Sequence, residues 1–161
     1  MILIALGANL PSPAGSPTAT LRAALVRLEE RGVKILSVSS FYETPAWPDP
    51  AQPAFVNAVA AVESTLQPVE LLTLLHGVET DFGRLRSAPN APRTLDIDLL
   101  DYDGKRMTDG VMLPHPRMAE RSFVLVPLAQ VAPNWRHPVT GEAVDALLAQ
   151  LLDREVPRLL P

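Results

Sequence analysis

The chain has 161 residues and a mass of 17.4 kDa, with 47% hydrophobic and 20% charged residues, which is typical of one globular domain spanning residues 1–161. Cysteine is absent, which excludes disulfides and thiolate metal sites and suits a cytoplasmic protein. The net charge of −4 argues against nucleic-acid binding, and no apolar run is long enough to span a membrane.

The first half of the chain is predicted to contain three strands and one helix. The apolar run 1–6 is typical of a buried strand, and apolar residues recur at helical spacing over 18–31. β-Branched and aromatic residues over 33–42 and 55–63 predict two further strands. Four prolines fall in the intervening segment 44–54, which excludes a helix or a central strand there and indicates a functional loop.

The second half is predicted to add one strand and three helices. Apolar residues at helical spacing predict a long helix from Pro68 to Gly83, and Leu95–Tyr102 is typical of a strand. A short hairpin is expected over 105–112. Two shorter helices are expected at Val124–Val131 and Val144–Leu152.

This order of strand, helix, strand, strand, helix, strand is the split βαβ arrangement of ferredoxin-like folds. We therefore expect an α+β fold, a ferredoxin-like α/β sandwich. Its antiparallel sheet has a βαββαβ core with two helices on one face, and a helical extension follows at the C-terminus. The other face of the sheet would be free for a site. Because such a fold hosts many functions, the chemistry has to be found in the residues.

Two aspartates on the strand Leu95–Tyr102 are the first candidates for a site. Side chains two residues apart on a strand share a face, so Asp96 and Asp98 are expected about 6–7 Å apart on one side. Neighbouring carboxylates repel each other unless a cation lies between them, and their hard oxygens favour Mg²⁺ shared with substrate phosphates. Two such ions could clamp the attacking and leaving oxygens. The alternative is a solvated strand face.

Arginines flank this aspartate pair. Half of the lysines and arginines, 7 of 14, lie between Arg84 and Arg121. Arg84, Arg86 and Arg93 supply planar cationic donors suited to phosphate oxygens, and phosphoryl transfer depends on this positioning and neutralisation. Neither a P-loop nor a G-x-G-x-x-G motif occurs, so a nucleotide would be held by side chains and metal. Ordinary surface arginines are the alternative.

Further candidates lie outside this run. His115, Arg117 and Arg121 could contact phosphate, and Phe123 could stack on a flat ligand. A buried histidine and a core phenylalanine are the alternatives for two of them. Asn57 would either cap a local backbone group or present its amide to a heterocycle with matching donors and acceptors.

Six motifs lie in order along nearly the whole chain: ALGANL at 5–10, SFYETP at 40–45, QPAFVN at 52–57, GRLR at 83–86, PRTLDID at 92–98, and PHPR followed by RSFVL within 114–125. Together they resemble the 6-hydroxymethyl-7,8-dihydropterin pyrophosphokinase family. The resemblance implies a ferredoxin-like sandwich, usually monomeric. It further implies transfer of the β,γ-pyrophosphoryl unit of ATP to the pterin hydroxymethyl group with release of AMP, a step of folate biosynthesis assisted by two Mg²⁺ ions.

The resemblance also implies a role for each candidate residue. Asp96 and Asp98 match the aspartates that hold Mg²⁺, and Arg84 and Arg93 match catalytic arginines that neutralise the migrating phosphates. The residues implied for pterin binding are Thr44, Pro45, Trp47, Phe55, Asn57 and Phe123. The residues expected to bind the nucleotide are Glu79, Arg84, Arg86, Arg93, His115, Arg117 and Arg121. No general base is evident, so a metal-polarised hydroxyl or one of the aspartates would accept the proton.

The sequence departs from the family pattern at three positions. Phe55 replaces a tyrosine of some members, Asn90 stands where others carry tryptophan, and Gly110 stands where some have a phosphate-facing arginine. The family implies that the loops 43–54 and 85–92 close over both substrates, which would exclude water. These departures bear on affinity and loop closure more than on the type of reaction.

Two other functions fit the same topology. An RNA-binding module is disfavoured by the acidic pI near 5.3 and by the aromatic content of 5%. A ligand-sensing regulatory domain would bind a metabolite through the same aspartates and arginines without turnover. Release of AMP separates the enzyme from such a sensor.

Overall fold

The computed structural model describes residues 1–85, 88–151 and 156–161. Its elements in chain order are β1 (Ile2–Ala8), α1 (Pro17–Glu30), β2 (Lys34–Val38), β3 (Tyr42–Thr44), β4 (Phe55–Glu63), α2 (Pro68–Asp81), β5 (Asp96–Tyr102), the 3₁₀ helix η1 (Met118–Glu120), α3 (Ser122–Val131), α4 (Val144–Ala149) and β6 (Arg158–Leu159). The strands form one sheet in the order β5-β1-β4-β3-β6, with β2 also paired to β4. Every strand pair is antiparallel, which confirms the predicted α+β sandwich.

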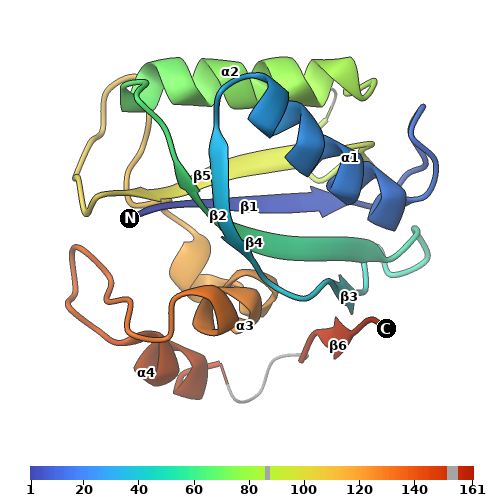
Figure 1. Cartoon of the computed structure of the whole chain (residues 1–161). Helices are drawn as coiled ribbons and strands as arrows, with labels where there is room; N and C mark the ends of the chain where they lie inside the picture. The colour runs from blue at the N-terminus through green and yellow to red at the C-terminus, as the bar shows by residue number, and fades with distance from the viewer. Residues whose placement is uncertain (86–87, 152–155) are drawn as a thin grey trace.

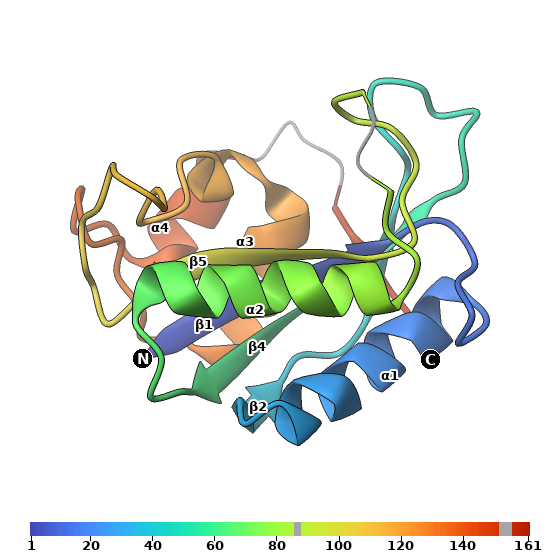
Figure 2. The same ribbon diagram turned by 90° about the horizontal axis from the view of Figure 1, so that it is seen from above.

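Helices α1 and α2 cover one face of the sheet, and α3 and α4 lie on the opposite face (Figure 1). Seen from above, α1 and α2 run across the same side of β1, β4 and β5 (Figure 2). The expectation of a free second face was wrong in part, because the C-terminal helices pack on it. The site occupies the part of that face that α3 does not cover. Among the described residues, no helix has the length and apolar character needed to cross a membrane.

Strand alternation builds a separate core on each face. Ile2, Ile4 and Leu6 of β1 point toward α1 and α2, where they pack with buried residues such as Leu21 and Leu75. On the other face the core joins the sheet to η1, α3 and α4; its buried members include Leu3, Val59, Leu100, Met118, Leu125, Trp135 and Leu147. The sheet is therefore buried on both sides except at the end that carries the site.

Several element boundaries differ from the prediction. The expected strand 33–42 is two strands, β2 and β3, because the ladder with β4 is interrupted at residues 39–41, where Gln130 of α3 accepts from the Ser40 N–H and the Tyr42 hydroxyl. Helix α3 begins at Ser122, directly after η1, rather than at 124. The expected hairpin over 105–112 is a single antiparallel bridge between Met107 and Leu113.

The short strand β6 was not predicted. Its two residues pair with Tyr42 and Glu43 of β3, and Arg158 donates to the Glu43 carboxylate at 2.9 Å. A two-residue strand has no periodicity of its own, so only the pairing across more than a hundred residues of chain defines it.

The predicted helix Val144–Leu152 ends at Ala149, and its last expected residue lies outside the described residues.

Candidate active site

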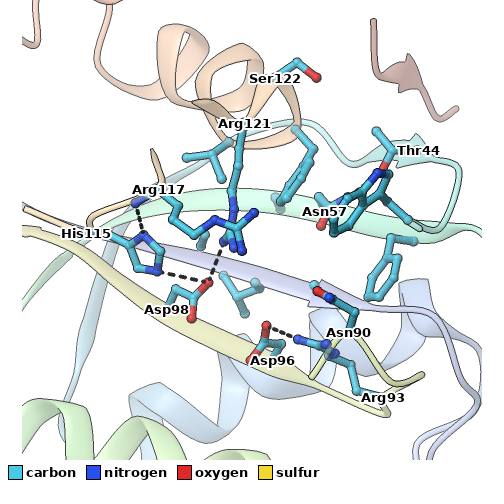
Figure 3. A pocket seen from close by; sticks show the side chains of 18 of the residues that line it. Thr44, Asn57, Asn90, Arg93, Asp96, Asp98, His115, Arg117, Arg121 and Ser122 are labelled. Atoms are coloured by element: carbon cyan, nitrogen blue, oxygen red, sulfur yellow. Dashed lines mark hydrogen bonds and ion pairs between the residues drawn. The ribbon is translucent and has the colours of Figure 1, made fainter. Parts of the chain in front are cut away.

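A cavity of about 610 Å³ opens on the uncovered part of the sheet, a size usual for a small-molecule site (Figure 3). Its floor comes from β1, β4 and β5, and its walls come from the segments that follow β3, precede β5 and lead into α3. The residues predicted for the site that line it are Thr44, Pro45, Trp47, Phe55, Asn57, Arg84, Arg93, Asp96, Asp98, His115, Arg117, Arg121 and Phe123. Residues far apart in the sequence thus surround one cavity.

Asp96 lies at the start of β5 between two arginines. Arg84 Nη1 donates to Asp96 Oδ1 at 3.0 Å, and Arg93 Nη1 donates to Asp96 Oδ2 at 2.9 Å. Burial raises the pKa of Asp96, but the positive charges of Arg93 and Arg84 outweigh it and hold the pKa below its usual range. Asp96 is therefore an ionised carboxylate at neutral pH, with both oxygens engaged.

Asp98 is the second carboxylate on the same face, as strand alternation predicts. His115 Nε2 lies 3.9 Å and Arg121 Nη1 lies 3.7 Å from Asp98 Oδ2, too far for a direct hydrogen bond (Figure 3). Burial, followed by the negative charge of Asp96, raises the pKa of Asp98 to about 6. Its oxygens are thus less engaged than those of Asp96.

His115 is held in one orientation by the backbone. The backbone N–H of His115 donates to the Leu100 carbonyl at 2.8 Å, and the ring Nδ1 accepts from the backbone N–H of Arg117 at 3.2 Å. Burial and the neighbouring charge of Arg121 lower the pKa of His115 to about 4. The imidazole is therefore neutral at pH 7 and turns Nε2 toward Asp98.

Polar side chains of Asn57 and Thr44 line the end of the cavity away from His115 and Asp98 (Figure 3). Asn57 of β4 is only 6% exposed and donates to the Thr44 hydroxyl at 3.0 Å. Phe55 and Phe123 line the same cavity, and an arginine guanidinium lies over each ring, Arg93 at 5.7 Å and Arg121 at 5.6 Å. An amide and two aromatic rings in one cavity are suitable groups for binding a planar heterocycle.

Comparisons with known proteins identify the family of the chain. Residues 3–133 match the family described as 7,8-dihydro-6-hydroxymethylpterin-pyrophosphokinase. A protein of Pseudomonas aeruginosa, 2-amino-4-hydroxy-6-hydroxymethyldihydropteridine pyrophosphokinase, is 38% identical over 160 residues, which cover 98% of this chain and 96% of that protein. The chain belongs to the dihydro-hydroxymethylpterin pyrophosphokinase family.

This chain also matches parts of longer proteins. A folic acid synthesis protein of Pneumocystis carinii is 34% identical over 161 residues, but this chain spans only 21% of its length. The crystal structure of Plasmodium falciparum HPPK-DHPS superposes with a TM-score of 0.73 at 14% identity, covering 95% of this chain and 41% of that one. At that identity the likeness shows a shared fold.

Two residues predicted for the nucleotide side are not placed in the cavity by the described structure. Glu79 of α2 is 2% exposed and accepts from the Ile97 N–H at 2.8 Å, so it lies behind β5 rather than in the lining. Burial raises the pKa of Glu79 to about 7, and Arg84 Nη1 lies 3.8 Å from its carboxylate. Glu79 is therefore better placed to support Arg84 and Asp96 than to contact a ligand. Arg86 lies outside the described residues.

The family departures fall in different places. Asn90 lines the cavity with a φ of 61°, a conformation that asparagine tolerates well. Gly110 lies away from the lining, with a φ of 76°, and a β-carbon there would approach Val69 to 2.9 Å. An arginine at 110 would therefore require a different backbone in this segment.

Among the described residues, eight that line the cavity were not predicted as site residues: Ala5, Leu6 and Gly7 of β1, Ala58 of β4, Asn90, Glu120 of η1, and Ser122 and Val124 of α3. Gly7 lies in the ALGANL motif, and its closeness to Asn57 appears only when β1 and β4 pair. Ser122 lies at the rim, where its hydroxyl points away from the two aspartates (Figure 3). Ser122 lies in the RSFVL motif and Asn90 departs from the family pattern, whereas Glu120 lies in no motif.

Proposed function

We propose that this chain transfers the pyrophosphoryl unit of ATP to the hydroxymethyl group of 6-hydroxymethyl-7,8-dihydropterin, giving the pterin diphosphate and AMP, a step of folate biosynthesis. We propose that it does so as a single monomeric domain in the cytoplasm. The observation that carries the proposal is one cavity with two chemically distinct ends. One end suits a flat heterocycle, and the other pairs two carboxylates with four arginines.

The heterocycle end supplies the pterin subsite. Asn57 presents an amide that can both donate to and accept from the pyrimidinone edge of a pterin, and its partner Thr44 fixes its orientation. Phe55 and Phe123 provide the stacking surfaces. Pro45 and Trp47 line the entrance, and Trp47 is 68% exposed, so its ring is free to settle on a bound ligand.

The charged end supplies the phosphate subsite. Arg84, Arg93, Arg117 and Arg121 line it, and their planar guanidiniums can each bind two phosphate oxygens. In this structure Arg84 and Arg93 are bonded to Asp96. Phosphates that take over these two arginines would leave the Asp96 carboxylate available to a cation. Neutral His115 adds a donor at Nε2 without adding charge.

The donor set fits Mg²⁺ shared with the nucleotide. Asp96 and Asp98 offer hard oxygen ligands, and the described part of the chain contains no cluster of three or more His, Cys, Asp or Glu that could hold a metal alone. Ligands from the ATP phosphates would therefore complete the coordination of two Mg²⁺ ions. When bound, Mg²⁺ neutralises phosphate charge and polarises the reacting oxygens.

Incubation of the purified protein with ATP, Mg²⁺ and 6-hydroxymethyl-7,8-dihydropterin tests the proposal. Mass analysis is expected to find AMP and the pterin diphosphate, and neither product should form when EDTA removes the metal. Asp96→Asn should lower kcat/KM by about a hundredfold or more, because it removes a charge from the reacting centre. Asp103→Ala, which removes an exposed carboxylate paired with the N-terminus, is the control.

Two results would contradict the assignment. An Asp96→Asn variant with wild-type turnover would remove the metal role of that carboxylate. Binding of ATP and pterin without AMP formation would favour the alternative of a ligand-sensing domain, since a sensor uses the same contacts without turnover.

A further inference from the structure

Asn9 is a buried polar residue immediately after β1 for which the proposed chemistry has no role. Its side chain is 1% exposed, and both ends of its amide are hydrogen-bonded. Asn9 Nδ2 donates to the Pro53 carbonyl at 3.0 Å, and Asn9 Oδ1 accepts from the Arg93 N–H at 2.8 Å. A single side chain thus joins backbone groups that are 40 residues apart in the sequence.

The two partners lie in the two segments that flank the cavity. Pro53 belongs to the 45–54 loop, and Arg93 ends the 88–93 segment. Both segments rise from the same end of the sheet (Figure 2). The Asn9 and Leu10 N–H groups also both donate to the Arg93 carbonyl, each at 3.1 Å. The backbone at Arg93 is therefore held at its N–H and at its C=O.

Each partner leads directly into one end of the site. Pro53 is two residues before Phe55, the ring at the heterocycle end, while Arg93 donates to Asp96 at the charged end. The guanidinium of Arg93 also lies 5.7 Å from the centre of the Phe55 ring. The amide of Asn9 therefore sets the separation between the wall that carries the ring and the wall that carries the arginine.

We propose that Asn9 is a positioning residue that holds the pterin wall and the phosphate wall of the cavity in register. The proposal rests on the proposed pyrophosphoryl transfer and names a residue on which its geometry depends. Transfer between two bound substrates requires near-contact of the reacting atoms, and a shift of about 1 Å between them can cost a hundredfold in rate. Asn9 acts through Phe55 and Arg93 and does not itself touch the reacting groups.

The Asn9 amide satisfies both partners at once, because it carries a donor and an acceptor on separate atoms. The Pro53 carbonyl needs a donor and the Arg93 N–H needs an acceptor, so aspartate loses the first bond and alanine loses both. A side chain that only stabilised the local fold would, on removal, lower stability and leave the kinetic constants unchanged. The readouts below separate these two roles.

The test compares Asn9→Ala with Thr20→Val. Thr20 is also a fully buried polar residue, and within the described part of the chain its hydroxyl bonds to the Ser12 hydroxyl and the Ser16 carbonyl, neither of which belongs to the two walls. With ATP, Mg²⁺ and 6-hydroxymethyl-7,8-dihydropterin, Asn9→Ala is expected to lower kcat/KM by between about tenfold and a hundredfold. Thr20→Val is expected to stay within about threefold of the wild type, whatever its loss of thermal stability.

Amide hydrogen exchange gives a readout that does not depend on turnover. In Asn9→Ala the 45–54 loop and the 88–93 segment should both exchange faster, while β1 and β4 exchange as in the wild type. Asn9→Asp keeps the acceptor and should release mainly the 45–54 loop. In the wild type the Arg93 amide should be protected although it lies outside any strand, and this needs no variant to fold.

Several outcomes would overturn the proposal. One is a kcat/KM of Asn9→Ala within about twofold of the wild-type value. Another is a loss of kcat/KM in Thr20→Val as large as that in Asn9→Ala. A freely exchanging Arg93 amide in the wild type would also refute the link. If the wild type forms no AMP, the proposed reaction is wrong, whereas unchanged exchange in both segments refutes the role of Asn9 independently.

Discussion

The contact between Gly7 and Asn57 shows how one missing side chain shapes the site. The two residues are paired across β1 and β4, and a β-carbon on residue 7 would lie 2.8 Å from Asn57 Oδ1. Real β-carbons do not approach oxygen so closely, and Asn57 is buried and bonded to Thr44, so it has little room to move. Gly7 is required because the Asn57 amide occupies the space above it.

Gly7→Ala should therefore weaken pterin binding much as Asn57→Ala does. We expect each to raise the Kd for 6-hydroxymethyl-7,8-dihydropterin by about tenfold, which corresponds to about 1.4 kcal/mol, with ATP binding nearly unchanged. Isothermal titration with each ligand measures both constants. Gly77→Ala, in α2 and away from the cavity lining, is the control. Equal losses for both ligands would argue against a pterin-specific role for Asn57.

The turn before α4 depends on a neutral histidine. His137 Nδ1 accepts from the Val139 N–H at 3.2 Å and from the Thr140 N–H at 3.3 Å, and the ring packs edge-on against Trp135 with centroids 5.8 Å apart. Burial lowers the pKa of His137 below its ordinary value of 6.5. Protonation of Nδ1 would remove the acceptor for both N–H groups, so the turn favours the neutral form.

The stability contribution of His137 should therefore disappear in acid. The folded protein binds this proton less readily than the unfolded chain does. The contribution is thus present above about pH 6.5 and is lost as the pH falls through the lower folded pKa. His137→Asn keeps an acceptor suited to such turns but does not titrate. Urea unfolding at about pH 7.5 and about pH 5.5 should show a smaller loss of stability for the variant than for the wild type.

The comparison with the wild type isolates this group. The pKa of His115 is also lowered, so the wild type and the variant share its contribution to acid sensitivity. An identical pH dependence in the two proteins would show that His137 is not the titrating group that stabilises the turn.

The two layers of the molecule are joined by a buried polar contact as well as by apolar packing. Asp101 of β5 accepts from Trp135 Nε1 at 2.8 Å and from the Gly104 N–H at 2.9 Å, and both Asp101 and Trp135 are buried. A bulge at Leu100 interrupts the β1–β5 pairing, so the consecutive residues Leu100 and Asp101 both point to the same face of the sheet. The C-terminal helices are thus tied to the strand that also carries the site aspartates.

Removing this contact should destabilise the whole molecule. Asp101→Ala leaves the Trp135 and Gly104 N–H groups without their partner, so we expect the free energy of unfolding to fall by about 2 kcal/mol. Denaturant unfolding followed by Trp fluorescence measures the loss. Asp103→Asn, two residues along the chain and exposed, removes the carboxylate but tolerates the φ of 52° there, so it should change the free energy of unfolding by less than about 1 kcal/mol. A loss no larger than that of the control would show that apolar packing alone joins the layers.

Local patterns in the chain were sufficient for much of this description. The period of apolar residues gave the helices and strands of the βαββαβ core, and alternation placed Asp96 and Asp98 on one face of β5. The ordered motifs gave the family, which the match of residues 3–133 confirmed. These features are readable because each depends on residues a few positions apart.

Other features depended on contacts between distant segments. Glu79 follows the helical period, yet only the packing of α2 on β5 shows that it lies behind the sheet and outside the cavity lining. Three other features also join residues tens of positions apart. They are the packing of α3 and α4 on the second face, the pairing of β6 with β3, and the two hydrogen bonds from the Asn9 side chain to Pro53 and Arg93. Such contacts leave no local periodicity, because they are fixed by how the layers pack and by which buried polar groups must find partners.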